Sequence, residues 1–286
     1  MASCRAALMA VALLLFASTA SAADYMGPLI DAHSHVPTAQ AIDAYVAAMK
    51  RHDIRKVVLL GVGGVQKNDA AWIAAAARKY PDQVVPGVPV PDPMSKGAAD
   101  ALDAALKHTN GRAVGEVHMR QAVRKIERSP SDPAFLKLLA VAARHGTPVI
   151  IHAELTAGLT AALEKALAAE RKAVIVLAHG GEATPGGLEA VLARNPNLMV
   201  DLSGMHFQRT PALATESGPL DPKWKALIEK MPDRFLVGID AWAPRLFEPA
   251  MLDRLMKWTR RVLGELPPDV AERVAWKNAA ALYRLK

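Results

Sequence analysis

The chain has almost no cysteine, since Cys4 is the only one among its 286 residues. This excludes a disulfide framework, a zinc site built from cysteines and a thiol nucleophile in the mature chain. The 18 glycines follow no triplet period and no heptad repeat runs for several turns, so the chain is neither collagen-like nor a coiled coil. With 51% hydrophobic and 22% charged residues, the composition is typical of a globular protein and not of a disordered one.

Blocks of one charge sign are also missing. The 35 Lys and Arg residues outnumber the 28 Asp and Glu residues, for a formal net charge of +7, but the basic residues are scattered among acidic ones. No basic stretch interleaved with aromatic residues indicates a nucleic-acid groove, so we expect no nucleic-acid partner. The excess charge is interpreted as a solvated, mildly basic surface.

The only long apolar run lies at the N-terminus. Residues 1–22 carry one charge, Arg5, followed by an apolar stretch at 6–17 and a small-residue ending at Ala22. This order is typical of a secretory signal peptide, and the apolar stretch is shorter than the roughly 20 residues that span a bilayer. We predict cleavage after Ala22, which leaves residues 23–286 without a membrane span and outside the cytoplasm, in the periplasm of a Gram-negative source.

Eight short apolar segments alternate with helical patterns along the rest of the chain. They lie at residues 29–33, 56–62, 84–90, 113–118, 148–152, 173–179, 198–202 and 235–240. Most are continuously apolar, as strands covered on both faces are, and helices supply the crossovers that parallel strands need. No linker or shift in composition divides the chain. The pattern predicts one (β/α)8 TIM barrel over residues 23–286, with a doubly wound open sheet as the alternative.

Capping residues mark three of the predicted helices. Thr38 is expected to open a helix at 39–50, and Asp69 one at 70–79. Asp132 followed by Pro133 predicts a third helix start, and Gly146 its end.

Residues able to bind metal stand where nearly every predicted strand ends. His33 and His35 are two residues apart, so on a strand their side chains point the same way and can reach one ion. Glu116, His152, His179 and Asp240 end the fourth, fifth, sixth and eighth predicted strands. Because active sites of such barrels lie at the C-terminal ends of the strands, we expect these six side chains to converge around a divalent cation.

At this point the sequence resembles the amidohydrolase superfamily, in its amidohydrolase-related branch. The resemblance rests on the order and strand placement of the six residues and on three phrases, LIDAHSH at 29–35, LAHGG at 177–181 and AWKNAAALYRL at 275–285. It covers roughly residues 29–285. It implies a metal-dependent TIM-barrel enzyme that acts on a small-molecule substrate.

The resemblance implies a hydrolase that uses metal-activated water on a small amide, lactone, ester or phosphoester, with Asp240 accepting the proton of that water. A non-oxidative decarboxylase of the aminocarboxymuconate-semialdehyde type is the alternative in the same branch. A non-catalytic metal- or ligand-binding barrel is the alternative of another class. Oligomeric state stays open, and a homo-oligomer is one possibility.

The number of ions stays open as well. If Glu116 bridges two ions, His33, His35 and Asp240 hold one, while His152 and His179 hold the other. If Glu116 is not a ligand, a single ion is held by His33, His35, His152 and Asp240, and His179 serves as the catalytic acid. Imidazole and carboxylate donors without thiolate favour zinc, with manganese, iron, nickel and cobalt as alternatives.

Further candidates for substrate contact or ligand orientation have weaker signals. Asp201 ends the seventh predicted strand and is expected to orient a ligand histidine. His118 shares the side of Glu116, and Trp242 follows Asp240 at the pocket wall. His206 and Arg209 lie in the long segment 203–224, which is interpreted as a substrate loop or as a surface excursion. The glycine-rich stretch at 61–64 lacks the residues of a phosphate-binding loop and is expected to be a tight turn.

Overall fold

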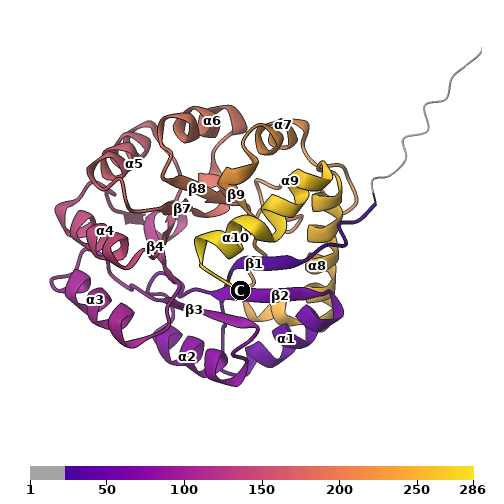
Figure 1. Cartoon of the computed structure of the whole chain (residues 1–286), viewed down its shortest axis with the longest axis horizontal. Helices are drawn as coiled ribbons and strands as arrows, with labels where there is room; N and C mark the ends of the chain where they lie inside the picture. Colours follow the sequence, from indigo (N-terminus) through magenta and orange to yellow (C-terminus); the bar gives the residue numbers. More distant parts are fainter. Residues whose placement is uncertain (1–22) are drawn as a thin grey trace, which may run out of the picture.

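The computed structural model describes residues 23–286, and the predicted signal peptide lies outside this range. Its centre is a ring of parallel strands with helices packed around the outside (Figure 1). The strands are β1 (Leu29–Ser34), β2 (Ile54–Leu59), β3 (Val84–Val88), β4 (Ala113–Gln121), β6 (Val149–Ala153), β7 (Ile175–Leu177), β8 (Leu198–Asp201) and β9 (Phe235–Leu236), with a short β5 (Ile126–Glu127) antiparallel to β4. The helices are α1 (Ala41–Arg51), α2 (Asp69–Lys79), α3 (Ala98–His108), α4 (Pro133–His145), α5 (Ala157–Ala169), α6 (Pro185–Arg194), α7 (Pro222–Lys230), α8 (Pro249–Gly264), α9 (Pro268–Glu272) and α10 (Asn278–Leu282).

The eight parallel strands pair in sequence order, β1-β2-β3-β4-β6-β7-β8-β9. This order is that of a barrel, and the doubly wound alternative, which reverses strand order at its centre, is wrong. The ladder is open between β9 and β1, but single backbone hydrogen bonds bridge the gap. Ala32 N donates to Val237 O at 2.9 Å, and Asp240 N donates to His33 O at 2.8 Å. The chain is therefore a single-domain, nearly closed eight-stranded parallel barrel.

Several predicted strands end earlier than expected, and in two of them a candidate site residue falls outside the strand. Strand β7 stops at Leu177, and His179 stands in a 3-10 turn, Ala178–Glu182, with a φ of 56°. Strand β9 stops at Leu236, four residues before Asp240, whose φ is 55°. Left-handed backbone is uncommon for residues other than glycine and concentrates at functional sites. The apolar runs continue to these positions, but the backbone turns there and redirects both side chains.

Of the three predicted helix caps, the one on α4 is confirmed. The Asp132 carboxylate accepts a hydrogen bond from Ala134 N at 2.8 Å, and Gly146 ends the helix with a φ of 59°. The caps at Thr38 and Asp69 are wrong, because α1 begins at Ala41 and Asp69 is already inside α2. Asp69 instead accepts a hydrogen bond from Val62 N at 2.7 Å, so its carboxylate holds the glycine-rich turn that follows β2.

The barrel interior has its own apolar cluster, separate from the larger core between strands and helices. Ile30, Val85 and Ala113 near the strand starts pack with Ala279 and Tyr283 from the last helical segment. In Figure 1, α10 lies across the middle of the ring. The C-terminal segment therefore closes the N-terminal end of the barrel, which leaves the opposite end for chemistry.

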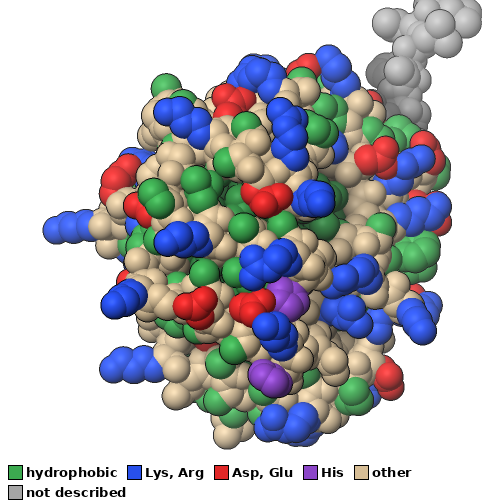
Figure 2. Space-filling view, turned by 60° about the vertical axis from the view of Figure 1, so that its left-hand side comes forward, with side chains coloured by type: hydrophobic (Ala, Val, Ile, Leu, Met, Phe, Trp, Pro, Cys, Tyr) green, Lys and Arg blue, Asp and Glu red, His purple; other side chains and the backbone are tan. Residues whose placement is uncertain are grey.

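One face of the molecule matches the expectation of scattered charge. On the face in Figure 2, Lys and Arg side chains lie among Asp and Glu side chains and do not form a continuous stripe. Within residues 23–286, no helix has the length and apolarity needed to cross a membrane.

Candidate active site

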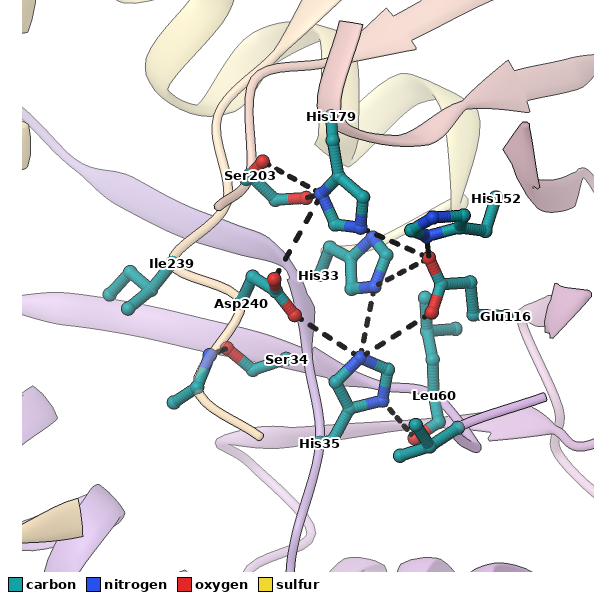
Figure 3. A network of polar contacts seen from close by, with 12 residues as sticks. His33, Ser34, His35, Leu60, Glu116, His152, His179, Ser203, Ile239 and Asp240 are labelled. Atoms are coloured by element: carbon teal, nitrogen blue, oxygen red, sulfur yellow. Dashed lines mark hydrogen bonds and ion pairs between the residues drawn. The ribbon is translucent and has the colours of Figure 1, made fainter. Parts of the chain in front are cut away.

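Six side chains predicted to converge lie together at the C-terminal end of the barrel (Figure 3). They come from β1 and its end, from β4 and β6, and from the turns after β7 and β9, and each is at most 6% exposed. The six are His33, His35, Glu116, His152, His179 and Asp240. The barrel thus brings together residues that are more than two hundred positions apart in sequence.

His33 and His35 direct two nitrogen lone pairs at one point. His33 Nδ1 donates to the Asp201 carboxylate at 2.9 Å, and His35 Nδ1 donates to Leu60 O at 2.9 Å. These partners place the ring protons on Nδ1, so both Nε2 atoms carry lone pairs. The two Nε2 atoms are only 3.2 Å apart. Facing lone pairs at this distance repel each other unless a cation lies between them, so this arrangement fits a metal ion.

Asp240 supplies an anionic oxygen to the same point. Its Oδ1 lies 3.3 Å from His35 Nε2, and its Oδ2 accepts from Arg209 Nη1. Burial alone would raise the pKa of Asp240, but the charge of His179, the hydrogen bond with His35 and the charge of Arg209 hold that pKa well below its usual range. Asp240 is therefore ionised, as a metal ligand has to be.

Glu116 is surrounded by imidazole rings. Its Oε1 lies 3.0 Å from His152 Nδ1 and 3.1 Å from His179 Nε2, while its Oε2 lies 3.1 Å from His118 Nε2. Burial opposes ionisation, yet the charge of His152 and the hydrogen bonds from the three rings lower the pKa of Glu116 well below its ordinary value. Glu116 is thus a carboxylate at the centre of the histidine cluster.

His179 is placed to carry a proton. Its Nδ1 lies 2.8 Å from Ser203 O, an acceptor, and its Nε2 lies 3.1 Å from a Glu116 oxygen, also an acceptor. Burial lowers the pKa of His179, but the charges of Asp240 and Glu116 outweigh burial and raise that pKa above its ordinary value. With acceptors at both nitrogens, the imidazolium form is favoured.

Three groups of these side chains bring one donor atom each to within 4.8 Å of one another. The groups are His33 with His35 and Asp240, His33 with Glu116 and His179, and Glu116 with His118 and His152. His152 falls in the group with Glu116 and His118 and in a further group with Glu154 and Glu182, and the number of ions stays a prediction. The nitrogen and carboxylate donors of the first group suit a divalent cation.

The weaker candidates fall in different places. Asp201 holds His33 from behind, as expected of an orienting carboxylate. His118 contacts Glu116, and Arg209 and Trp242 line the pocket beside them. His206 is 3% exposed and packs near Phe207 and Trp258. Within residues 23–286, the pocket lining does not include His206.

A pocket of about 320 Å³, including the open solvent at its mouth, lies at the C-terminal end of the barrel. Besides the side chains already described, Gln121 and Arg124 line it. Sequence reasoning missed both, because the fourth strand was expected to end at residue 118. Strand β4 runs on to Gln121 and turns into a hairpin with β5, which carries Arg124 to the pocket.

Comparison with known proteins places this arrangement in a family. The model of the amidohydrolase family matches residues 18–285. The chain belongs to the amidohydrolase family. Its nearly closed barrel and buried His/Glu/Asp cluster agree with that family of metal-dependent TIM-barrel enzymes, as the sequence predicted. No match was found among curated proteins.

Several solved structures share the fold of this amidohydrolase. A 2,6-dihydroxybenzoate decarboxylase in complex with 2,6-dihydroxybenzoate is 13% identical, with a TM-score of 0.62, covering 90% of this chain and 98% of that one. A dihydroxybenzoic acid decarboxylase from Polaromonas with bound manganese and 2-nitroresorcinol is 15% identical, with a TM-score of 0.63 and coverage of 91% and 97%. A probable 2-pyrone-4,6-dicarboxylic acid hydrolase from Acinetobacter baumannii with bound citric acid is 15% identical, with a TM-score of 0.64 and coverage of 90% and 99%. At these identities the likeness concerns the fold.

Proposed function

We propose that this amidohydrolase is a divalent-metal-dependent non-oxidative decarboxylase of a small, carboxylate-bearing molecule. The observation that carries the proposal is that two guanidinium groups, Arg124 and Arg209, line the same pocket as His179, whose protonated form is favoured. Arg209 is paired with Asp240, so the Arg124 guanidinium is the group that suits an anionic substrate. The imidazolium suits a reaction in which a proton is delivered. Two of the fold relatives described above are decarboxylases of aromatic acids, which supports this choice over hydrolysis.

His33, His35 and Asp240 are the residues we propose as the metal site, because their donor atoms face one point. A cation bound there would withdraw electrons from oxygen atoms of the substrate. The donor set does not separate zinc from manganese, and the Polaromonas decarboxylase contains manganese. Zinc therefore stays a prediction from sequence.

The proton chemistry follows from the side chains. The bond between the substrate carbon and its carboxylate breaks, carbon dioxide leaves, and the electron pair remains on the carbon. The His179 imidazolium donates its proton to that carbon, and solvent reprotonates the ring. Asp240 is ionised and held by Arg209, and its charge stabilises the imidazolium form of His179. The proposed role of Glu116 is to keep the surrounding histidine rings in place.

Hydrolysis is the second candidate, favoured by one observation. Glu116 Oε1 lies 3.9 Å from His33 Nε2 and 3.0 Å from His152 Nδ1, so its carboxylate would be available to help hold a second cation. In that reaction Asp240 would accept a proton from the attacking water, which would cleave an amide, lactone, ester or phosphoester.

The test is a release assay on the purified chain. Aromatic carboxylates, beginning with 2,6-dihydroxybenzoate, are incubated with and without a chelator, and carbon dioxide is measured by trapping. We expect release that the chelator abolishes and that His179→Asn lowers by about 100-fold. A parallel panel of esters, lactones and phosphoesters identifies a hydrolase instead, and turnover on neither panel despite bound metal indicates a non-catalytic barrel.

Export is proposed from the sequence of residues 1–22. N-terminal sequencing of the protein isolated from its source tests it. A mature N-terminus at Ala23 in a periplasmic fraction is the expected result, and an intact Met1 in the cytoplasm is the contradicting one.

A further inference from the structure

The hairpin formed by β4, a 3-10 turn and β5 presents unsatisfied polar groups near the pocket. Gln121 Oε1 and Arg124 Nη1 are buried, and neither has a hydrogen-bond partner among residues 23–286. Both side chains line the pocket with His118 and His152. Because buried polar atoms without partners are costly, Arg124 Nη1 is available to donate to a bound molecule and Gln121 Oε1 to accept from one.

One carboxylate holds this hairpin in place. Glu154 follows β6 and is 13% exposed, and its Oε2 accepts from Arg120 Nη1 at 2.6 Å. Its two oxygens also accept from the backbone N–H of Ala122, at 3.0 and 3.1 Å. Ala122 is the first residue of the turn that carries Arg124. The Glu154 carboxylate therefore fixes both the strand end and the turn of the hairpin.

We propose that Glu154 is a positioning residue: it holds the β4–β5 hairpin so that the Arg124 guanidinium binds the carboxylate of a substrate. The proposal rests on the proposed function for the substrate class. Among the described residues, Glu154 does not line the pocket. Its carboxylate also lies within 4.8 Å of ligand atoms of His152 and Glu182, so the hairpin contacts are not its only link to the site. Its effect is on substrate affinity, because the turn has to be ordered before the guanidinium meets an anion.

The chain offers a matched control. Glu127 pairs with the same Arg120, at 3.3 Å, but its side chain is 74% exposed. An exposed pair of this kind contributes little to stability. Glu127→Gln therefore removes a charge near Arg120 and leaves the contact between Glu154 and Ala122 in place. Glu154→Ala removes the contacts to both Arg120 and Ala122. Glu154→Gln removes the charge but keeps an acceptor for the Ala122 N–H.

Two measurements test the proposal on the full chain. The first is amide hydrogen exchange over residues 119–128, which we expect to speed up about tenfold in Glu154→Ala and to stay unchanged in Glu127→Gln. The second is calorimetric binding of 2,6-dihydroxybenzoate, whose Kd we expect to rise about tenfold in Glu154→Ala and in Arg124→Met, less in Glu154→Gln, and not in Glu127→Gln. Where turnover is measured, KM rises with Kd while kcat changes less.

The outcomes separate this inference from the proposed function. Binding of the probe without release of carbon dioxide contradicts the decarboxylase and leaves the positioning role standing. Unchanged exchange and unchanged Kd in Glu154→Ala overturn the positioning role. Failure of the wild-type chain to bind 2,6-dihydroxybenzoate or benzoate overturns the carboxylate binding.

Discussion

At the scale of single residues, the site depends on side chains that hold other side chains. Asp201 is the clearest case. It accepts from His33 Nδ1 at 2.9 Å, from His179 N at 3.2 Å and from Ser203 N at 3.1 Å. Through these contacts one buried carboxylate sets the direction of His33 and the position of the His179 turn.

Asp201→Asn is expected to weaken metal binding by about 10- to 100-fold while leaving the fold intact, because the amide no longer fixes the ring proton of His33 on Nδ1. Titration against a competing chelator measures the affinity. Asp92→Asn, at an exposed residue paired with Arg128, is the control and should bind metal as the wild type does. Wild-type metal affinity in the Asp201→Asn variant would remove Asp201 from the site.

Because His206 is buried, we expect the protein to lose stability in acid. Burial lowers its pKa from 6.5 to about 4, so the unfolded chain takes up a proton at a higher pH than the folded chain does. The free energy of unfolding therefore has its full value with respect to His206 above about pH 6.5. It falls by roughly 3 kcal/mol in total as the pH is lowered towards 4. His206→Gln should flatten this part of the profile of unfolding free energy against pH in urea titrations. Profiles with the same slope for variant and wild type would show that His206 is not the cause.

At the scale of elements, the C-terminal segment acts as a plug. Tyr283 is 1% exposed and packs inside the barrel with Ile30, Val85 and Ala113. Tyr283→Ala is expected to cost about 3–5 kcal/mol of unfolding free energy, because the cavity lies in a closed apolar cluster. Urea unfolding measures it, with the partly buried neighbour Leu282→Ala as the control of smaller effect. A cost below that of the control would mean that the plug does not support the barrel.

The barrel could be predicted from the sequence because its signal is local. Continuous apolar runs, helical periods between them and polar residues at run ends all depend on neighbouring residues. The same locality explains the errors. His179 and Asp240 each follow directly on an apolar run. The residue types in those runs do not predict the left-handed backbone at either position. Thr38 and Asp69 are residue types that commonly cap helices. Asp69 does not cap α2 because its carboxylate accepts a hydrogen bond from the turn after β2.

The candidate site was predictable in its histidines and acids but not in its arginine at the hairpin. Histidines and acids at strand ends carry a desolvation cost that makes them conspicuous in a sequence. Arg124 lies in a polar stretch where arginines are ordinary, and only the pairing of β4 with β5 brings it to the pocket. The role of Glu154 depends on contacts between the end of β6 and that hairpin. These contacts cannot be predicted from residue spacing in the sequence.

At the scale of the whole molecule, the barrel joins distant stretches of chain around one point, so a bound ion should stabilise the entire fold. We expect added zinc or manganese to raise Tm with concentration, and EDTA to lower it, because the ion binds the folded chain and not the unfolded one. Calorimetric melting curves at several metal concentrations measure the shift. A Tm that is the same with metal and with EDTA would contradict this coupling.

The most direct test of the account is the metal content of the purified chain, measured by elemental analysis without added metal. Wild-type protein should hold about one divalent ion per chain, and His33→Ala and His35→Ala should hold close to none. A wild-type chain free of metal that also fails to take up zinc or manganese on titration would contradict the account, as would alanine variants that keep the ion.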